Sequence, residues 1–406
     1  MTIIIHLLTT TCVVLLLTMG TGFFDLAYAT SKNLKQQKSE SLSSTWSKTF
    51  TTFSNYPAVV IATSDGGYLM TGSKGESAKD TGSSMWVMKT DSRGKSIWEK
   101  GFSPHKNSSN HGYAAIETAD GYLVTGTKNL SVLHGWSAWN ELWVIKLAKN
   151  GATIWEKGYG CQWGANSSAG EGRSIIKTDD GGCIVSGFGS VRGVMDAWVV
   201  RLDRNGNRKW EKFLGAADDR GGVSPVSVAK GTDGHFYAAF TIPDEHAVFF
   251  KLDSAGNILW RHQINQYQRS SLGSLSATSD GGLIIAGSGD DDGLLAKYDL
   301  NGSIGWHKTF GKNQQGRNAG LLAVTETTDN GFIATGGISL GKALLWILRT
   351  DNRGMPLWDK EISDRHQSTG YAVVQASDGR YVVCGRDDTG VAVWLLKLDA
   401  AGTHGK

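Results

Sequence analysis

The chain contains little proline and little cysteine, with 5 and 4 residues respectively among 406. So few prolines beside 53 glycines fit a fold with many tight turns rather than a disordered chain. An excess of charge of either sign is also missing, because 41 basic residues face 38 acidic ones and the net charge is +3. A nucleic-acid partner is therefore not expected.

The few cysteines do not indicate a metal site. Cys12 lies in an N-terminal segment that is expected to be removed, and Cys161, Cys183 and Cys384 form an odd set without the spacing of metal ligands. A disulfide between Cys161 and Cys183 is sterically allowed. Burial as small apolar side chains is the favoured interpretation for Cys183 and Cys384.

Motifs for catalysis and for cofactors are missing as well. The sequence has no G-x-S-x-G, no P-loop and no G-x-G-x-x-G that opens a helix, and the histidines show no H-E-x-x-H spacing. The run from Asp290 to Asp292 lacks the alternating ligands and the final Glu of a calcium loop, so we interpret it as a solvated turn, with Ca²⁺ binding as the alternative. We expect neither a metal nor a cofactor.

The chain does contain a tryptophan that recurs seven times, at intervals of 46 to 57 residues, each with a basic residue two positions later. Self-similarity at such a period is typical of repeat architectures. The seven are Trp46, Trp98, Trp155, Trp210, Trp260, Trp306 and Trp358.

Each repeat also carries two tight turns flanked by apolar strands. The first is an Asp-Gly or Asn-Gly turn, as at residues 65–66, and the second is a four-residue turn that ends in Gly, as at residues 91–94. One basic residue lies before the second turn of each repeat. We expect its aliphatic stem to pack on the sheet, with its charge in water or paired with a turn aspartate. These residues are Lys89, Lys146, Arg201, Lys251, Lys297, Arg349 and Lys397.

One repeat therefore predicts four antiparallel strands, the content of one propeller blade. The chain opens with a lone fourth strand at residues 45–50 and closes with a third strand at residues 393–398 that lacks its fourth. Joining the two completes a blade and removes the open sheet edges. The sequence thus predicts an all-β fold, a seven-bladed β-propeller of four-stranded blades over residues 44–406, closed by the N-terminal strand.

The N-terminal residues do not follow the repeat. Residues 1–29 are largely apolar and end in Ala27-Tyr28-Ala29, the arrangement of a secretory cleavage site. The start of this segment has no lysine or arginine. We predict a signal peptide at residues 1–29, a flexible polar leader at residues 30–43, and a secreted or periplasmic protein. Stable membrane insertion is not expected after cleavage, and an uncleaved membrane anchor is the alternative.

The repeat topology indicates where function concentrates. In an up-and-down blade, the two short turns lie on one face of the ring, which we predict to be scaffold. The irregular loops lie on the other face, and function concentrates on such loops. Trp136, Trp139 and Trp163 lie there, outside the repeat pattern, and suit stacking on sugars or binding a partner protein; packing within their own loops is the alternative. The other candidate binding residues are His134, Glu171, His111, Asp218, Asp219 and Arg317.

The repeat unit contains Asp-Gly-Gly, an apolar strand, and then Trp-Val-x-Lys-Leu-Asp-x-x-Gly-x-x-x-Trp-x-Lys. It resembles the repeats of secreted bacterial β-propeller proteins, and more distantly the tryptophan-docking repeats of quinoprotein dehydrogenases and of outer-membrane-assembly propellers. Those last two folds usually have eight blades, and quinoprotein enzymes use an adjacent cysteine pair that this sequence lacks. The Asp-boxes of sialidases have the pattern Asp-x-Gly-x-x-Trp, in which each spacing is one residue shorter than in the Asp-x-x-Gly-x-x-x-Trp of this sequence. The resemblance therefore implies a fold and not an activity.

Two functions stay open at this point. The first is an exported, non-catalytic binding or scaffold propeller that recognises a glycan or protein partner through the irregular face. The alternative is an exported enzyme, either a hydrolase or lyase acting on a saccharide or a quinoprotein-like oxidoreductase, with its site at the mouth of the central channel. A carboxyl group with a raised pKa in a central pocket would favour the enzyme, and an open aromatic-rimmed surface would favour binding.

Overall fold

The structure is a computed structural model. It describes residues 45–53, 59–75, 82–130, 140–160, 170–191, 194–215, 224–242, 246–267, 270–311, 318–339, 343–363, 367–387, 389 and 391–404. Over these ranges the chain forms strands and turns without a helix, and so without a helix that could cross a membrane. Thr45–Lys406 form one compact unit. The predicted signal peptide and leader lie outside the described residues.

The strands form seven four-stranded antiparallel sheets, the blades, which we number along the chain. Blades one and two consist of β2 (Val59–Ala62), β3 (Tyr68–Lys74), β4 (Ser84–Thr90), β5 (Ser96–Phe102), β6 (His111–Thr118), β7 (Gly121–Asn129), β8 (Asn140–Ala148) and β9 (Thr153–Tyr159). Blades three and four consist of β10 (Gly170–Lys177), β11 (Cys183–Val191), β12 (Val194–Leu202), β13 (Arg208–Phe213), β14 (Ser224–Lys230), β15 (Phe236–Thr241), β16 (Ala247–Leu252) and β17 (Ile258–Gln263).

Blades five and six continue the same pattern. They consist of β18 (Ser270–Ala277), β19 (Leu283–Gly289), β20 (Asp292–Tyr298), β21 (Ile304–Phe310), β22 (Asn318–Glu326), β23 (Phe332–Ser339), β24 (Ala343–Thr350) and β25 (Pro356–Ile362). Blade seven combines the two ends of the chain: β26 (Gln367–Gln375), β27 (Tyr381–Asp387), β28 (Ala392–Leu398) and β1 (Trp46–Thr51).

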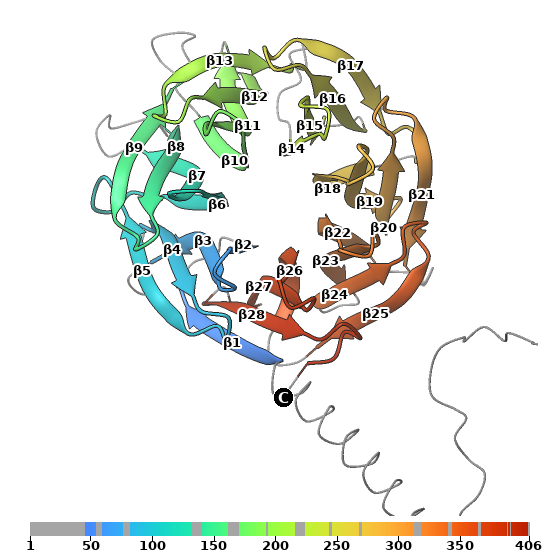
Figure 1. The fold of residues 1–406 in the computed structure, drawn as a ribbon. Helices are drawn as coiled ribbons and strands as arrows, with labels where there is room; N and C mark the ends of the chain where they lie inside the picture. The colour runs from blue at the N-terminus through green and yellow to red at the C-terminus, as the bar shows by residue number, and fades with distance from the viewer. Residues whose placement is uncertain are drawn as a thin grey trace, which may run out of the picture. The chain divides into compact units, whose positions relative to one another are not determined.

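Strand β1 closes the ring, as the sequence predicted. It pairs antiparallel with β28, from Trp46 opposite Lys397 to Thr51 opposite Ala392. Figure 1 shows the blue β1 beside the red β28, and it also shows that the first strand of each blade lies nearest the axis of the ring. The predicted seven-bladed β-propeller is confirmed.

Aspartate and glycine together shape the second turn of six blades, and in blade two Ala148 stands in place of the aspartate. In blade one, Asp91 Oδ1 accepts hydrogen bonds from the backbone N–H groups of Arg93 and Lys95, both at 2.9 Å, and Gly94 has a φ of +73°. Only glycine takes such a φ without steric cost, and aspartate is suited to bonding the backbone just after it. The Asp-x-x-Gly pattern in the sequence therefore predicts the geometry of this turn.

A buried cation pairs with the aspartate of the first turn in every blade. In blade one, Lys89 Nζ lies 2.9 Å from Asp65 Oδ2, and the Lys89 side chain is 3% exposed. Burial raises the pKa of Asp65, but hydrogen bonds from Thr63 and Lys89 outweigh it and hold the pKa at about 2. The expected pairing with turn aspartates is confirmed, because a buried ammonium group needs such a partner. The other pairs are Lys146–Asp120, Arg201–Asp180, Lys251–Asp233, Lys297–Asp280, Arg349–Asp329 and Lys397–Asp378.

The repeat tryptophans connect each blade to the next. Trp98 of blade one donates its indole N–H to the carbonyl oxygen of Lys149 in blade two, at 3.1 Å. Gly151 follows in the same turn, and a Cβ atom there would lie 2.9 Å from the Trp98 ring. The glycine is thus required both for its positive φ, +80°, and for this close approach. Turn glycines contact the other repeat tryptophans in the same way: Gly94, Gly206, Gly256, Gly302, Gly354 and Gly402.

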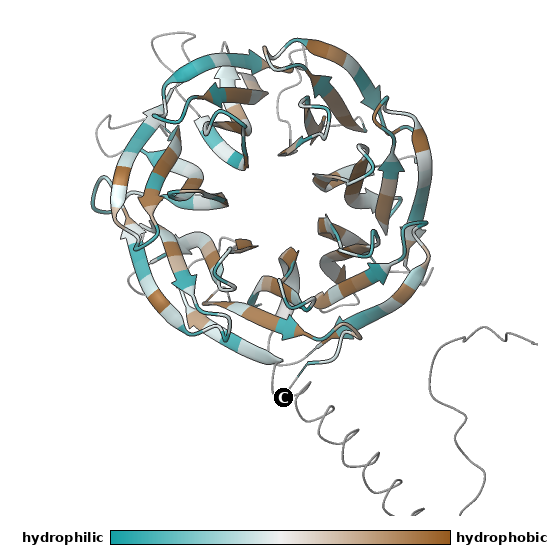
Figure 2. Cartoon of the chain, in the orientation of Figure 1, coloured by the Kyte–Doolittle hydropathy of each residue, from teal (hydrophilic) through white to brown (hydrophobic). Residues whose placement is uncertain are grey.

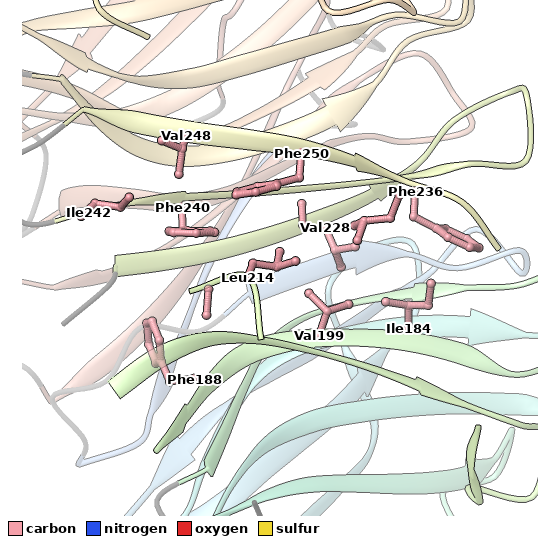
Figure 3. Packing of buried hydrophobic residues seen from close by; sticks show 13 residues of the cluster. Ile184, Phe188, Val199, Leu214, Val228, Phe236, Phe240, Ile242, Val248 and Phe250 are labelled. Atoms are coloured by element: carbon pink, nitrogen blue, oxygen red, sulfur yellow. The ribbon is translucent and has the colours of Figure 1, made fainter. Parts of the chain in front are cut away.

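One apolar cluster fills each of the seven junctions between blades. Figure 3 shows the junction of blades three and four, where Val199 of blade three lies toward Val228 of blade four. The rings of Phe240 and Phe250 in the same cluster stack with their centres 5.5 Å apart. In Figure 2 the third strands are largely brown, whereas the outermost strands are mostly teal or white. The hydrophobic core is therefore divided among the junctions, and burial of apolar area holds neighbouring blades together.

The described cysteines belong to these clusters. Cys183 lies between blades two and three and Cys384 between blades seven and one, at 1% and 0% exposure. Burial raises the pKa of Cys183 to about 12. The interpretation of both as small apolar side chains is confirmed. Cys161 lies outside the described residues, so its pairing is still a hypothesis.

Candidate functional site

The connections between the second and third strands of each blade share one face of the ring with the links between blades, and we call it the loop face. The two tight turns of each blade lie on the other face, which we call the turn face. First strands begin at the loop face, so the start of β6 and the start of β10 meet there, close to the axis (Figure 1). This brings His111 and Glu171 to the same end of neighbouring blades. Seven predicted site residues lie outside the described residues: Trp136, Trp139, Trp163, His134, Asp218, Asp219 and Arg317.

Side chains from three neighbouring blades meet at this end of the first strands. We call them the axial cluster: Ser73, His111, Tyr113, Glu171, Arg173 and Phe188. The guanidinium carbon of Arg173 lies 3.9 Å from the ring centre of Tyr113. Arg173 Nε and Nη2 donate to Glu171 Oε2 at 2.9 and 2.6 Å. A cation is thus held between an aromatic ring and a carboxylate.

The ion pair is the part of the axial cluster that reaches solvent. The side chains of Arg173 and Glu171 are 33% and 20% exposed, whereas Tyr113 and His111 are 8% and 6% exposed. A partner that approaches along the axis from the loop face therefore meets a guanidinium and a carboxylate group that rest on an aromatic ring.

The sequence predicted Glu171 and His111 but missed Arg173 and Tyr113. The register of β10 shifts between Gly172 and Ser174, and that of β6 shifts between Gly112 and Ala114, so Arg173 and Tyr113 are equivalent bulge residues. Bulges re-aim side chains, which explains why these two meet across the blade junction. A signal was present, because Gly-Tyr or Gly-Arg recurs near the start of three first strands, at residues 112–113, 172–173 and 370–371.

His111 is held in place by a hydrogen bond between blades. Its Nδ1 atom lies 2.7 Å from Ser73 Oγ of blade one, and both side chains are buried. Burial lowers the pKa of His111 to about 4, and the positive charge of Arg173 adds to this effect, so the ring is neutral at neutral pH. A Ser–His bond is also the basis of nucleophilic catalysis. Here neither side chain is open to a substrate, so the pair joins blades one and two.

Asp196, near the loop-face end of β12, is the described carboxyl group whose pKa is raised. Burial raises the pKa of Asp196 to about 6, although hydrogen bonds from the backbone N–H groups of Ala197 and Gly215 lower it in part. Its Oδ1 atom is buried and has no hydrogen-bond partner among the described residues. Among the described residues, no charged side chain contributes to the shift. Within these residues, Asp196 therefore lacks the second titratable group that acid–base catalysis uses.

Asp196→Asn is expected to stabilise the protein at neutral pH and to have little effect near pH 4. The folded-state pKa, about 6, lies above the ordinary 3.8, so the folded state binds the extra proton between these values and loses stability as the pH rises through about 6. Asparagine does not ionise and avoids this loss. Thermal melting of both proteins between about pH 4 and 8 tests this, and a difference in melting temperature that does not change with pH would contradict the unpaired burial of Asp196.

The acidic run at residues 290–292 forms an exposed tight turn between β19 and β20. Asp290 and Asp291 have φ values of +49° and +73°, and positive φ at both central residues is typical of a type I′ hairpin. Across the described ranges, no group of three or more His, Cys, Asp or Glu side chains is arranged to hold a metal.

A polar hollow of about 400 Å³ lies at the loop-face end of blade one. It is lined by Lys74, residues 82–84 and residues 103–108, including His105. Lys74 forms an ion pair with Glu99, which also accepts the indole N–H of Trp86 at 2.8 Å. His105 lines this hollow, whereas His111, six residues later, belongs to the axial cluster.

Comparison with known proteins shows a likeness in fold. No family model and no curated protein matches this sequence. The chain is similar to a puromycin hydrolase mutant complexed with PGG, with a TM-score of 0.56 and 13% identity over 86% of this chain and 53% of the hydrolase, about half of its length. It is also similar to YCF48 bound to D1 peptide, with a TM-score of 0.52 and 12% identity over 86% of this chain and 94% of that one. At such low identity the likeness concerns the fold alone.

Proposed function

We propose that this protein is an exported, non-catalytic binding propeller that recognises a partner through its loop face. The contact region comprises the axial cluster and the neighbouring loops of blades two and three, which include the candidates Trp136, Trp139 and Trp163. The observation that carries the proposal is the half-buried Arg173–Glu171 pair on Tyr113, near the axis. Arginine and aromatic side chains of this kind are the residues on which binding energy concentrates.

Catalysis has little support among the described residues. Ser73 and His111 are bonded but buried, Glu171 is neutralised by Arg173, and Asp196 has no titratable partner. Nucleophilic and acid–base mechanisms need such groups to be both paired and open to the substrate. The arrangement therefore suits recognition better than reaction.

A peptide segment of a protein is the partner that we place first, with a glycan as the second. A guanidinium group that already bonds a carboxylate can exchange Glu171 for an acidic side chain or a chain terminus of the partner. The fold likeness extends to nearly the whole of YCF48, whose structure holds a bound peptide. A glycan would instead depend on stacking against the loop tryptophans.

Peptide and glycan arrays probed with residues 30–406 test the proposal. We expect a ligand whose affinity falls by at least about tenfold in Arg173→Met, since charge-assisted hydrogen bonds contribute roughly 1.5–3 kcal/mol. Methionine keeps an apolar contact with Tyr113, so the melting temperature should change little. The triple variant of Trp136, Trp139 and Trp163 to Ala should also lose binding.

The matched control is a pair of exposed basic residues on the turn face, Lys95 and Arg353, whose replacement by Met should leave binding unchanged. If Arg173→Met and the tryptophan variant both bind every array ligand as the unmodified protein does, the loop face is not the recognition surface.

A further inference from the structure

A cavity of about 480 Å³ lies on the turn face, at the junction of blades five and six. Its volume falls within the range of small-ligand pockets, roughly 300–1,000 Å³. The sequence had assigned this face to scaffold. The lining residues used in the argument are Asp280, Lys297, Gly305, Trp306, Glu326 and Phe332.

The junction of blades one and two shows what such a place binds within this same chain. There, Ser64 donates its backbone N–H and its hydroxyl to the two carboxylate oxygens of Glu117, at 2.7 and 2.8 Å. The ammonium group of Lys149 forms an ion pair with Glu117 and lies 5.0 Å from the ring centre of Tyr122. A lysine side chain is thus held by a carboxylate and an aromatic ring.

The junction of blades five and six repeats this framework. Ser279 donates its N–H and its hydroxyl to Glu326, at 2.7 and 2.9 Å. The rings of Trp306 and Phe332 lie 5.8 Å apart, as Trp98 and Tyr122 do at 6.1 Å. The carbonyl oxygen of Asn352 accepts the indole N–H of Trp306 at 3.2 Å, in the position that Lys149 occupies in blade two. The two junctions are therefore structurally equivalent.

Two substitutions distinguish them. Asn352 stands where blade two has Lys149, and Gly305 stands where blade one has Ile97. Both positions line the cavity, and both substitutions reduce the side-chain volume there. Glu326 consequently has its serine hydrogen bonds but no ion pair with a lysine or arginine in the part of the chain that the structure describes.

The charges around the cavity leave Glu326 uncompensated. Lys297 is 11% exposed and is already paired with Asp280, at 2.8 Å. Asp299 bonds the backbone N–H groups of its own turn, at Asn301 and Ser303. The Glu326 carboxylate and the rings of Trp306 and Phe332 thus line a space that the equivalent junction fills with a lysine.

We propose that this cavity binds a primary alkylammonium group of the lysine side-chain type. The ammonium group pairs with Glu326 over the ring of Phe332, and the alkyl chain packs on the indole of Trp306. Carboxylate pairing and cation–π attraction both select a cation, and the apolar walls select a chain that carries it.

The experiment uses Nα-acetyl-lysine methylamide as the probe and Nα-acetyl-norleucine methylamide as its uncharged control, titrated into residues 30–406 by calorimetry and saturation-transfer NMR. We expect the lysine probe alone to bind, at one site per chain. Pentane-1,5-diamine distinguishes the sources of the group: tighter binding of the diamine indicates a free amine, and tighter binding of the capped lysine indicates a protein side chain.

Three variants locate the site. Glu326→Gln should weaken the lysine probe by at least about tenfold, because it removes the charge but keeps the serine hydrogen bonds. Asn352→Lys should abolish binding by supplying the lysine that blade two has, and Gly305→Ile should do so by filling the rim without changing charge. Arg173→Met, on the opposite face, should leave binding unchanged, which separates this site from the proposed loop-face function.

The converse variant opens the equivalent junction. Lys149→Asn combined with Ile97→Gly should raise the number of lysine probes bound from one to two per chain. Equal binding of the norleucine control, or unchanged binding in folded Glu326→Gln and Gly305→Ile proteins, would overturn the proposal.

Discussion

Deleting residues 30–52 is expected to destabilise the entire ring by several kcal/mol. The deletion removes β1, whose six residues form a complete ladder with β28. It also removes Trp46, which packs against Gly94 of blade one and lies 5.9 Å from the ring of Tyr68. Loss of a packed tryptophan costs about 3–5 kcal/mol on its own, and the exposed edge of β28 favours aggregation.

Thermal and urea unfolding of the deletion variant measure this effect. The matched control is deletion of residues 30–43 alone, which removes the predicted leader and keeps β1. We expect the control to melt within a degree or two of residues 30–406. If the longer deletion melts there too, β1 does not hold the ring closed.

Trp198→Ala is expected to cost about 3–5 kcal/mol, the effect of truncating a fully buried large aromatic side chain. Trp198 is 0% exposed, stacks on Phe213 with ring centres 5.8 Å apart, and donates its indole N–H to Glu211 at 3.0 Å. A Cβ atom on Gly170 would lie 3.2 Å from its ring. Since Gly170 begins β10, the cavity left by the substitution also loosens the strand that positions the axial cluster.

Chemical unfolding measures this cost, and Ile154→Ala is the comparison. Ile154 is 51% exposed on β9, so its truncation should change the free energy of unfolding by no more than about 0.5 kcal/mol. Similar destabilisation by the two substitutions would contradict a core concentrated at the blade junctions.

Much of this fold could be predicted because the controlling interactions are local in sequence. Asp91 and Gly94 determine one turn within four residues, and the pattern repeats often enough to count blades. Ring closure followed from an unmatched strand at each end. The contact partners across junctions could not be predicted in this way, because the pairing of Trp98 with the turn of Lys149 depends on how neighbouring sheets pack.

The candidate site was predicted less completely. Glu171 was identified as a charged residue on an irregular segment, but Arg173 was missed because its contact with Tyr113 depends on two β-bulges in different blades. His111 was predicted as a candidate, but its burial against Ser73 could not be predicted, because it depends on how blades one and two pack together. Residue type and spacing predict which residues can bind; only packing decides which ones reach solvent.

Hydrogen–deuterium exchange of the protein with and without its array-selected ligand tests the loop-face proposal most directly. The account predicts slower exchange in the ligand complex at the starts of β6 and β10, around Tyr113 and Arg173, with unchanged exchange in the turns at residues 91–94 and 351–354. Protection confined to those turns, with none at β6 or β10, would contradict it.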